Sequence, residues 1–80
     1  MVEKLISRVG ELLTSRFEVA PDDVSPDASF DDLGLDSLAQ VELGEILEQN
    51  FGIEVSDEEM EKLATLADLA ELLKQKGVAA

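Results

Sequence analysis

One serine in this chain of 80 residues stands where a hydroxyl group could be chemically modified. Ser37 comes directly after Asp36, a residue type that favours helix N-caps, and follows a long stretch rich in Pro, Asp and Ser. Backbone N–H groups in the first turn of a helix are unpaired and partially positive, so a phosphate attached there is stabilised. Ser37 is therefore a candidate phosphodiester site, although a serine beside a helix start is more often only a capping or surface residue.

The composition leaves few routes to catalysis. The chain contains no His and no Cys, so it has no imidazole base, no Ser-His-Asp or Cys-His arrangement, and none of the usual zinc ligand sets. Ser37 also has no Lys near it in the sequence to activate its hydroxyl. We therefore expect a protein that is not an enzyme and that binds no metal.

The acidic residues are concentrated in the middle of the chain. The formal net charge is -13, and the stretch from Phe17 to Glu61 holds fifteen Asp or Glu residues but no Lys or Arg. Such a segment repels nucleic acids and anionic membranes and attracts basic surfaces of other proteins. It also suits a merely solvated surface, so charge alone leaves both interpretations open. We expect protein partners with basic patches, no nucleic acid and no membrane.

Two segments before Ser37 must position it. Apolar residues recur at three-and-four spacing from Val2, which predicts an amphipathic helix at about Val2 to Arg16. The stretch from Phe17 to Leu35 holds both prolines and predicts a long loop, with room for a short helical turn. We expect six apolar side chains to pin this loop to the core: Phe17, Val19, Val24, Phe30, Leu33 and Leu35.

The second predicted helix carries Ser37 at its start. It begins at the N-cap Asp36, runs to about Asn50, and ends at Phe51 and Gly52. Its predicted apolar side consists of Leu38, Val41, Leu43, Ile46 and Leu47.

Two capping boxes, opening at Ser56 and Thr65, predict two more helices. The first is brief, at about Asp57 to Leu63, and the last runs from about Leu66 to Lys76. The predicted fold is all-α: a four-helix bundle of three long helices and one short third helix, with a long loop between helices one and two. We expect the whole chain, residues 1–80, to form a single domain.

The motif around Ser37 resembles that of acyl carrier proteins. The resemblance rests on LGLDSL at residues 33–38, VEL at residues 41–43 and EEMEKL at residues 58–63, and it covers most of the chain. It implies that Ser37 receives 4'-phosphopantetheine from coenzyme A as a covalent attachment. The terminal thiol of this arm would then carry acyl groups as thioesters, while partner enzymes make and break the bonds.

The resemblance also implies a recognition surface along helix two and helix three. Acidic side chains at the rim of an apolar spot would steer a basic partner, and the apolar side chains would be buried on contact. Alternatively, Leu38 and Val41 are partly core and the glutamates merely solvated. The expected partners are a phosphopantetheinyl transferase, an acyltransferase, a ketosynthase and other pathway enzymes, acting on a freestanding, cytoplasmic monomer. The matching positions are Asp36, Leu38, Val41, Glu42, Glu48, Met60 and Glu61.

Two features depart from the fatty-acid branch of this family. Ala39 stands where that branch often has an acidic residue, and Gly44 with Glu45 replaces positions that are commonly apolar there. The pathway, fatty-acid or polyketide, therefore stays open. Because Gly inside a helix costs about 1 kcal/mol relative to Ala, one hypothesis is that Gly44 makes room for an acyl chain between helices.

Two alternatives compete with an acyl carrier. An acidic calcium-binding helical module fits poorly, because a loop counted from Asp31 has Leu33 and Leu35 at ligand positions and Asp36 where Gly is required; only Glu42, at the last position, fits. Peptidyl or aryl carrier proteins of nonribosomal pathways are closer rivals. Their attachment motif more often has Gly followed by His or Asp before the serine, whereas this chain has Leu35 and Asp36.

Overall fold

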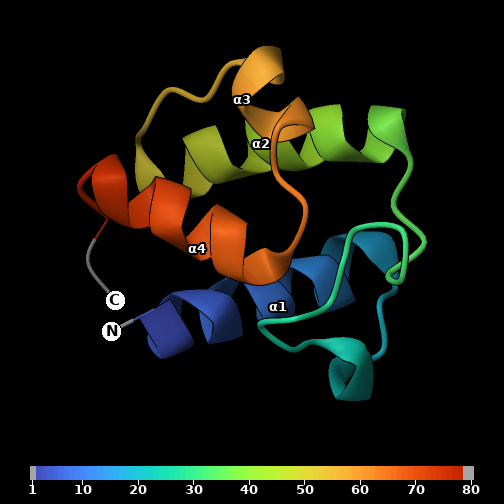
Figure 1. The fold of residues 1–80 in the computed structure, drawn as a ribbon. Helices are drawn as coiled ribbons and strands as arrows, with labels where there is room; N and C mark the ends of the chain where they lie inside the picture. Colours follow the sequence, from blue (N-terminus) through green and yellow to red (C-terminus); the bar gives the residue numbers. More distant parts are fainter. Residues whose placement is uncertain (1, 79–80) are drawn as a thin grey trace.

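The computed structural model describes residues 2–78 and confirms the predicted all-helical fold (Figure 1). Residues 2–78 contain four α-helices, one 3-10 turn and no extended strand. The elements, in chain order, are α1 Val2–Phe17, the 3-10 turn η1 Pro21–Asp23, α2 Ser37–Phe51, α3 Asp57–Glu61 and α4 Leu66–Gln75.

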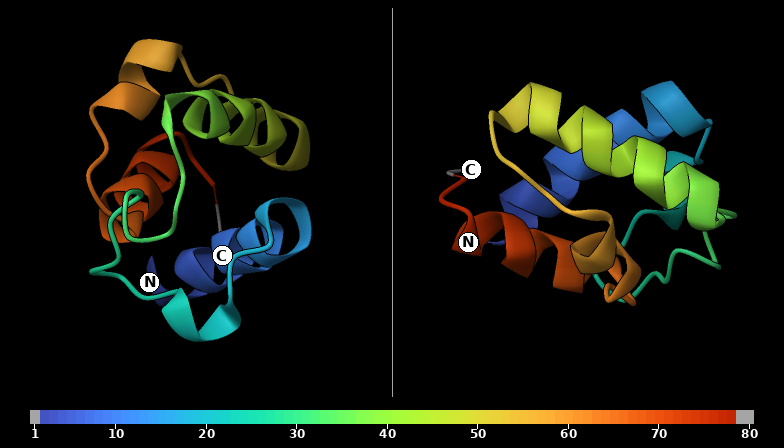
Figure 2. Two further views of the ribbon diagram at one scale, coloured as in Figure 1. Left: turned by 90° about the vertical axis from the view of Figure 1, so that its right-hand side faces the viewer. Right: turned by 90° about the horizontal axis from the view of Figure 1, so that it is seen from above.

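The three longer helices surround one core, and the short α3 covers the side between α2 and α4 (Figure 2). Helix α4 packs along α1, while α3 packs on α2. The start of α2 lies at the opposite end of the molecule from the start of α1 and the end of α4 (Figure 1). Among residues 2–78, no helix has the length and apolarity that crossing a bilayer requires.

The core is built from apolar side chains of all four helices and the long loop. No polar or charged residue is buried among the described residues, so no desolvated charge opposes folding. Burying one leucine fully contributes about 1.5–3 kcal/mol. The largest fully buried side chains are those of Val9, Leu13, Leu43, Leu47, Met60, Leu66, Leu69 and Leu73.

The helix ends follow the predicted capping signals. Both capping boxes form, at Ser56 before α3 and at Thr65 before α4. Gly52, with φ of 66°, ends α2 in the left-handed conformation. Gly77, with φ of 91°, ends α4, and the next N–H, from Val78, donates to the Leu73 carbonyl at 3.0 Å. Helix α3 ends at Glu61, two residues before the predicted end at Leu63.

The loop of residues 18–36 is anchored to the helices as predicted. Val19, Phe30 and Leu35 are buried, and Val24 and Leu33 pack against the core. The sixth predicted anchor, Phe17, also packs against the core but is the last residue of α1. Two loop carbonyls accept backbone N–H groups from the first turn of α4: Ala28 O from Leu66 at 3.1 Å, and Pro26 O from Ala67 at 3.0 Å. The loop therefore supplies acceptors that the start of α4 lacks within its own helix.

Gly10 lets the loop approach α1 closely. A Cβ atom at this buried position would lie 2.7 Å from Cγ1 of Val24. Val24 packs against the core beside η1, and its short, branched side chain has little freedom to move away. The small size of Gly10 therefore matters more here than its low helix propensity.

We predict that Gly10→Ala destabilises the protein by about 1 kcal/mol, because an overpacking cost of about 1–3 kcal/mol exceeds the gain in helix propensity of about 1 kcal/mol. In a Val24→Ala background the same substitution should stabilise the protein, since the obstructing methyl groups are gone. Urea unfolding of the four proteins of this cycle measures both effects. An equal effect of Gly10→Ala in the two backgrounds would contradict the close contact.

The charge distribution generates a second prediction. All fifteen acidic residues of the 17–61 stretch lie in the loop after α1, on α2, on α3 or between these helices, and the stretch itself contains no Lys or Arg. One of them, Glu59, pairs with a cation from outside the stretch, Lys76. Their mutual repulsion is screened by salt. The melting temperature should therefore rise between about 0.02 M and about 0.2 M sodium chloride, and magnesium should raise it further at equal ionic strength. A melting temperature that does not change with salt would contradict this prediction.

Candidate functional site

Ser37 is the first residue of α2 and is exposed. The preceding residue, Asp36, is the N-cap: its Oδ1 accepts the Ala39 N–H at 2.8 Å, and its carbonyl accepts the Gln40 N–H at 3.0 Å. Because Asp36 performs the capping, the Ser37 hydroxyl is not needed for it. Among residues 2–78, no group forms a hydrogen bond with that hydroxyl, which leaves it available for modification.

The surroundings of Ser37 suit a phosphate-linked group. The Ser37 and Leu38 N–H groups have no acceptor in the described part of the chain, and they lie at the positive end of a helix of 15 residues. Leu35, two residues before Ser37, is only 5% exposed and fixes the approach of the loop to the helix. A phosphodiester on this hydroxyl would therefore sit beside free donors while its organic arm extends into solvent.

The structure brings part of the predicted recognition surface together next to Ser37. Leu38 is 67% exposed, the one large apolar side chain so exposed among the described residues. Val41 and Glu42 follow at the third and fourth positions after it, so the three share one helix face. Val41 is half-buried and Glu42 exposed. We call these three residues the α2 face. Of the other predicted residues, Asp36 and Glu61 are exposed and Glu48 is half-buried.

The predicted apolar side of helix two is partly wrong. The side chains that α2 buries are those of Leu43 and Leu47, with Gly44 beside them, whereas Leu38 points to solvent and Val41 and Ile46 are only half-buried. Apolar residues occupy almost every direction around this helix, so spacing alone does not identify the inward side.

Met60 does not belong to the exposed surface. Its side chain is only 1% exposed, so the prediction that it offers apolar area to a partner is wrong for this structure. Met60 packs instead against α2, where a Cβ atom at Gly44 would lie 3.1 Å from its Cγ atom. In this structure the space that Gly44 leaves is therefore occupied by Met60.

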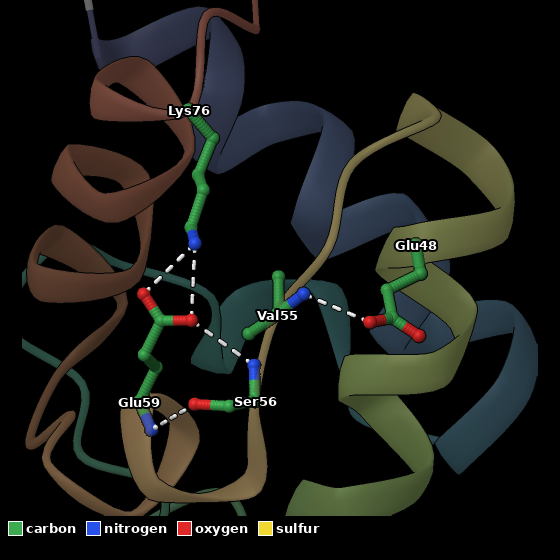
Figure 3. Close-up of polar contacts among 5 residues, drawn as sticks. All are labelled: Glu48, Val55, Ser56, Glu59 and Lys76. Atoms are coloured by element: carbon green, nitrogen blue, oxygen red, sulfur yellow. Dashed lines mark hydrogen bonds and ion pairs between the residues drawn. The ribbon is translucent and has the colours of Figure 1, made fainter.

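Glu48 has a structural contact that the sequence did not predict. Its Oε2 accepts the Val55 N–H at 2.8 Å in a partly buried setting (Figure 3). Val55 is buried and precedes the N-cap of α3. Glu48 therefore ties the 52–56 connection to α2, and its carboxylate is less free for a partner than that of Glu42.

Glu59 joins the short α3 to the end of α4. Its carboxylate accepts the Ser56 N–H at 3.0 Å and pairs with Lys76 Nζ at 2.9 Å (Figure 3). The Ser56 N–H and, after it, the Lys76 side chain lower the pKa of Glu59 below its ordinary value. The capping box revealed the first contact in the sequence, but nothing there indicated the pairing with Lys76, 17 residues away.

Three comparisons with known proteins agree with this geometry. The family model for the phosphopantetheine attachment site matches residues 7–73. An acyl carrier protein of Bdellovibrio bacteriovorus is 45% identical over 73 residues, which cover 90% of this chain and 94% of that protein. One of Thermosynechococcus vestitus is 40% identical over 74 residues, 91% of each chain. The crystal structure of an acyl carrier protein of Thermotoga maritima matches with a TM-score of 0.84 and 27% identity, over 94% of this chain and 88% of that one.

The chain belongs to the acyl carrier protein family. Its cofactor is therefore phosphopantetheine, as predicted. Because acyl carrier proteins are carriers and work with the enzymes of their pathways, the expectation that the chain is not itself an enzyme is confirmed. Within residues 2–78, no three acidic side chains gather in a group that could hold a metal ion.

The contacts of Glu59 in this acyl carrier protein predict a specific pH dependence. A carboxylate whose pKa is lowered on folding stabilises the native state at neutral pH, and this contribution disappears as the pH falls through the folded-state pKa. The free energy of unfolding of the native sequence should exceed that of Glu59→Gln at pH 7, and the difference should shrink below about pH 4. Urea unfolding followed by circular dichroism at several pH values measures the difference.

Glu58→Gln serves as the matched control, because it removes an exposed carboxylate from the same helix and leaves the Glu59 contacts in place. The difference in free energy of unfolding between the native sequence and Glu58→Gln should not show the pH dependence expected for Glu59→Gln. If the free energies of unfolding of the native sequence and Glu59→Gln differ by a constant amount from pH 7 to about pH 3, the lowered pKa of Glu59 is contradicted.

Proposed function

We propose that Ser37 is the attachment residue and that the protein presents acyl thioesters on its phosphopantetheine arm to the enzymes of fatty-acid or polyketide synthesis. The observation that carries the proposal is the exposed Ser37 hydroxyl at the start of α2. This hydroxyl is not used to cap the helix, because Asp36 is the N-cap. The LGLDSL motif at residues 33–38, read in a chain of this family, supports the same residue.

Attachment requires a base that accepts the proton of the Ser37 hydroxyl. The Ser37 oxygen forms a bond to phosphorus of coenzyme A, the diphosphate bond breaks, and adenosine 3',5'-bisphosphate leaves. The chain has no His, and its Lys residues lie on α1, at the end of α3, or in and just after the last turn of α4. We assign the base for the hydroxyl proton to the transferase, because Oδ1 of Asp36, the carboxylate nearest in sequence, already accepts the Ala39 N–H. The carrier contributes an exposed oxygen and free N–H donors. When bound, the arm supplies the thiol that forms the thioester.

The α2 face supports docking of enzymes with basic, partly apolar patches. Leu38 and Val41 offer apolar surface next to Ser37, and neither is needed in the core. Glu42 on the same face, Asp36 at the start of α2 and Glu61 at the end of the adjacent α3 are exposed acidic groups that would speed encounter with a basic patch. Glu48 is half-buried and accepts the Val55 N–H, so its carboxylate is less free for a partner than that of Glu42, and the buried Met60 lies outside the docking surface.

We further propose that residues 1–80 form one carrier domain that acts as a monomer in the cytoplasm. The four helices share a single core, and the family model covers residues 7–73. The choice between a fatty-acid and a polyketide pathway depends on the docking enzymes. Loading the holo protein with malonyl-coenzyme A by acyltransferases of each kind, and comparing their kcat/KM values, tests that choice.

Incubation with coenzyme A and a phosphopantetheinyl transferase should add the mass of one arm to the native chain and none to Ser37→Ala. Intact-mass spectrometry measures the gain. Ser25→Ala is the matched control, because it removes an exposed loop hydroxyl from the same loop, and it should be modified as the native chain is. Equal uptake by Ser37→Ala would show that another residue carries the arm.

Charge reversal on the α2 face should slow docking without unfolding the protein. Glu42→Lys should lower kcat/KM for acyl transfer from the holo protein to a ketosynthase several-fold at low salt, and the loss should diminish at high salt. Glu54→Lys, at an exposed site beyond the other end of α2, controls for net charge and should have little effect. Equal losses for both variants would contradict a localised docking face.

A further inference from the structure

The segment just before Asp36 forms a closed turn. Its last N–H, from Leu35, donates to the Phe30 carbonyl at 2.9 Å, and the Gly34 N–H donates to the Asp31 carbonyl at 3.0 Å. This pair of nested bonds is the pattern by which helices are usually ended, here closing a single turn. The first and last residues of the turn, Phe30 and Leu35, are 2% and 5% exposed, so both ends are held in the core.

The start of the turn is fixed as well. The Asp32 N–H donates to Ser29 Oγ at 3.0 Å, and Ser29 forms an antiparallel bridge with Thr65 at the start of α4. The turn is therefore attached to α4 on one side and runs directly into the N-cap of α2 on the other. Its conformation determines the direction in which the chain reaches Ser37.

Gly34 is the residue on which this direction depends. Its φ is +75°, and no atom lies within 4 Å of where a Cβ would stand. A side chain at this position therefore meets no neighbour, and the effect of a substitution comes from the backbone alone. Residues with a Cβ disfavour a positive φ. Gly34→Ala therefore shifts the turn toward conformations in which the backbone continues from residue 34 into Leu35 at a different angle.

We infer that Gly34 is a positioning residue for modification of this carrier: its left-handed conformation sets the orientation in which Asp36 and Ser37 are offered to the phosphopantetheinyl transferase. The inference rests on the proposed role of Ser37. The Leu35 side chain is held in the core only two residues before Ser37. A change of the backbone dihedral angles at position 34 therefore moves mainly the residues that follow Leu35, Asp36 and Ser37. Misplacement of a reacting group by about 1 Å can slow a reaction on the order of a hundredfold.

The chain contains a matched control for this inference. Gly52 also has a positive φ, +66°, and a Cβ atom there would likewise have no neighbour within 4 Å, but it lies at the other end of α2. That helix spans 15 residues, a length of about 22 Å at 1.5 Å per residue. Gly52→Ala therefore imposes a similar backbone penalty far from Ser37.

The experiment compares kcat/KM for transfer of the arm from coenzyme A in the native chain, Gly34→Ala, Gly34→Asn and Gly52→Ala. Magnesium is present, and the temperature is one at which all four give native circular dichroism. Gly34→Ala should be modified about tenfold more slowly, and Gly52→Ala within about twofold of the native rate despite a similar fall in melting temperature. Gly34→Asn should recover most of the rate, because Asn tolerates the left-handed region.

A native rate for Gly34→Ala, or an equal loss for Gly52→Ala, would overturn the positioning role. If Gly34→Ala does not fold in buffer, the four proteins are compared in sucrose or trimethylamine N-oxide, which stabilise the folded state, and the same two outcomes decide the question. Ser37→Ala is run alongside. Uptake of the arm by Ser37→Ala would refute the attachment proposal itself, whereas loss of uptake there with a native rate for Gly34→Ala would refute only the inference about Gly34.

Discussion

The hydrogen bond from the Ala39 N–H to Asp36 Oδ1 is the interaction on which the proposed attachment site, Ser37, depends. A helix needs a capping group at its start, and Ser is among the residue types that usually provide one. Here Asp36 caps α2, so the next residue, Ser37, is left exposed with its hydroxyl unused. The same arrangement leaves N–H groups of the first turn free for a phosphate. A local detail of helix capping thus separates a structural serine from one that can be modified.

The rest of the fold holds that helix start at an accessible place. The long loop is pinned by apolar side chains and by backbone bonds to α4, and it delivers the chain to α2 at the end of the molecule opposite to the first turn of α1 (Figure 1). Exposed carboxylates and Leu38 lie beside the site. The arrangement fits a carrier, whose work is to display a tethered group to several enzymes while performing none of the chemistry itself.

Features set by local interactions could be predicted from the sequence, and features set by tertiary packing could not. The capping box at Ser56, the end of α2 at Gly52 and the cap before Ser37 each depend on residues within four positions of one another. The inward side of α2 could not be predicted, because apolar residues surround that helix and the contact with α3 decides which are buried. For the same reason the sequence did not predict that Met60 is buried in this contact. Nor did it predict that Glu59 pairs with Lys76, just after α4.

Fragmentation mass spectrometry of the modified protein tests the central claim most directly, because it locates the arm among all the hydroxyl groups of the chain. The sequence offers six serines and two threonines as acceptors. We predict that the added mass is found only in fragments that contain Ser37. An arm located on any other serine or threonine, or a chain that takes up none, would contradict this assignment.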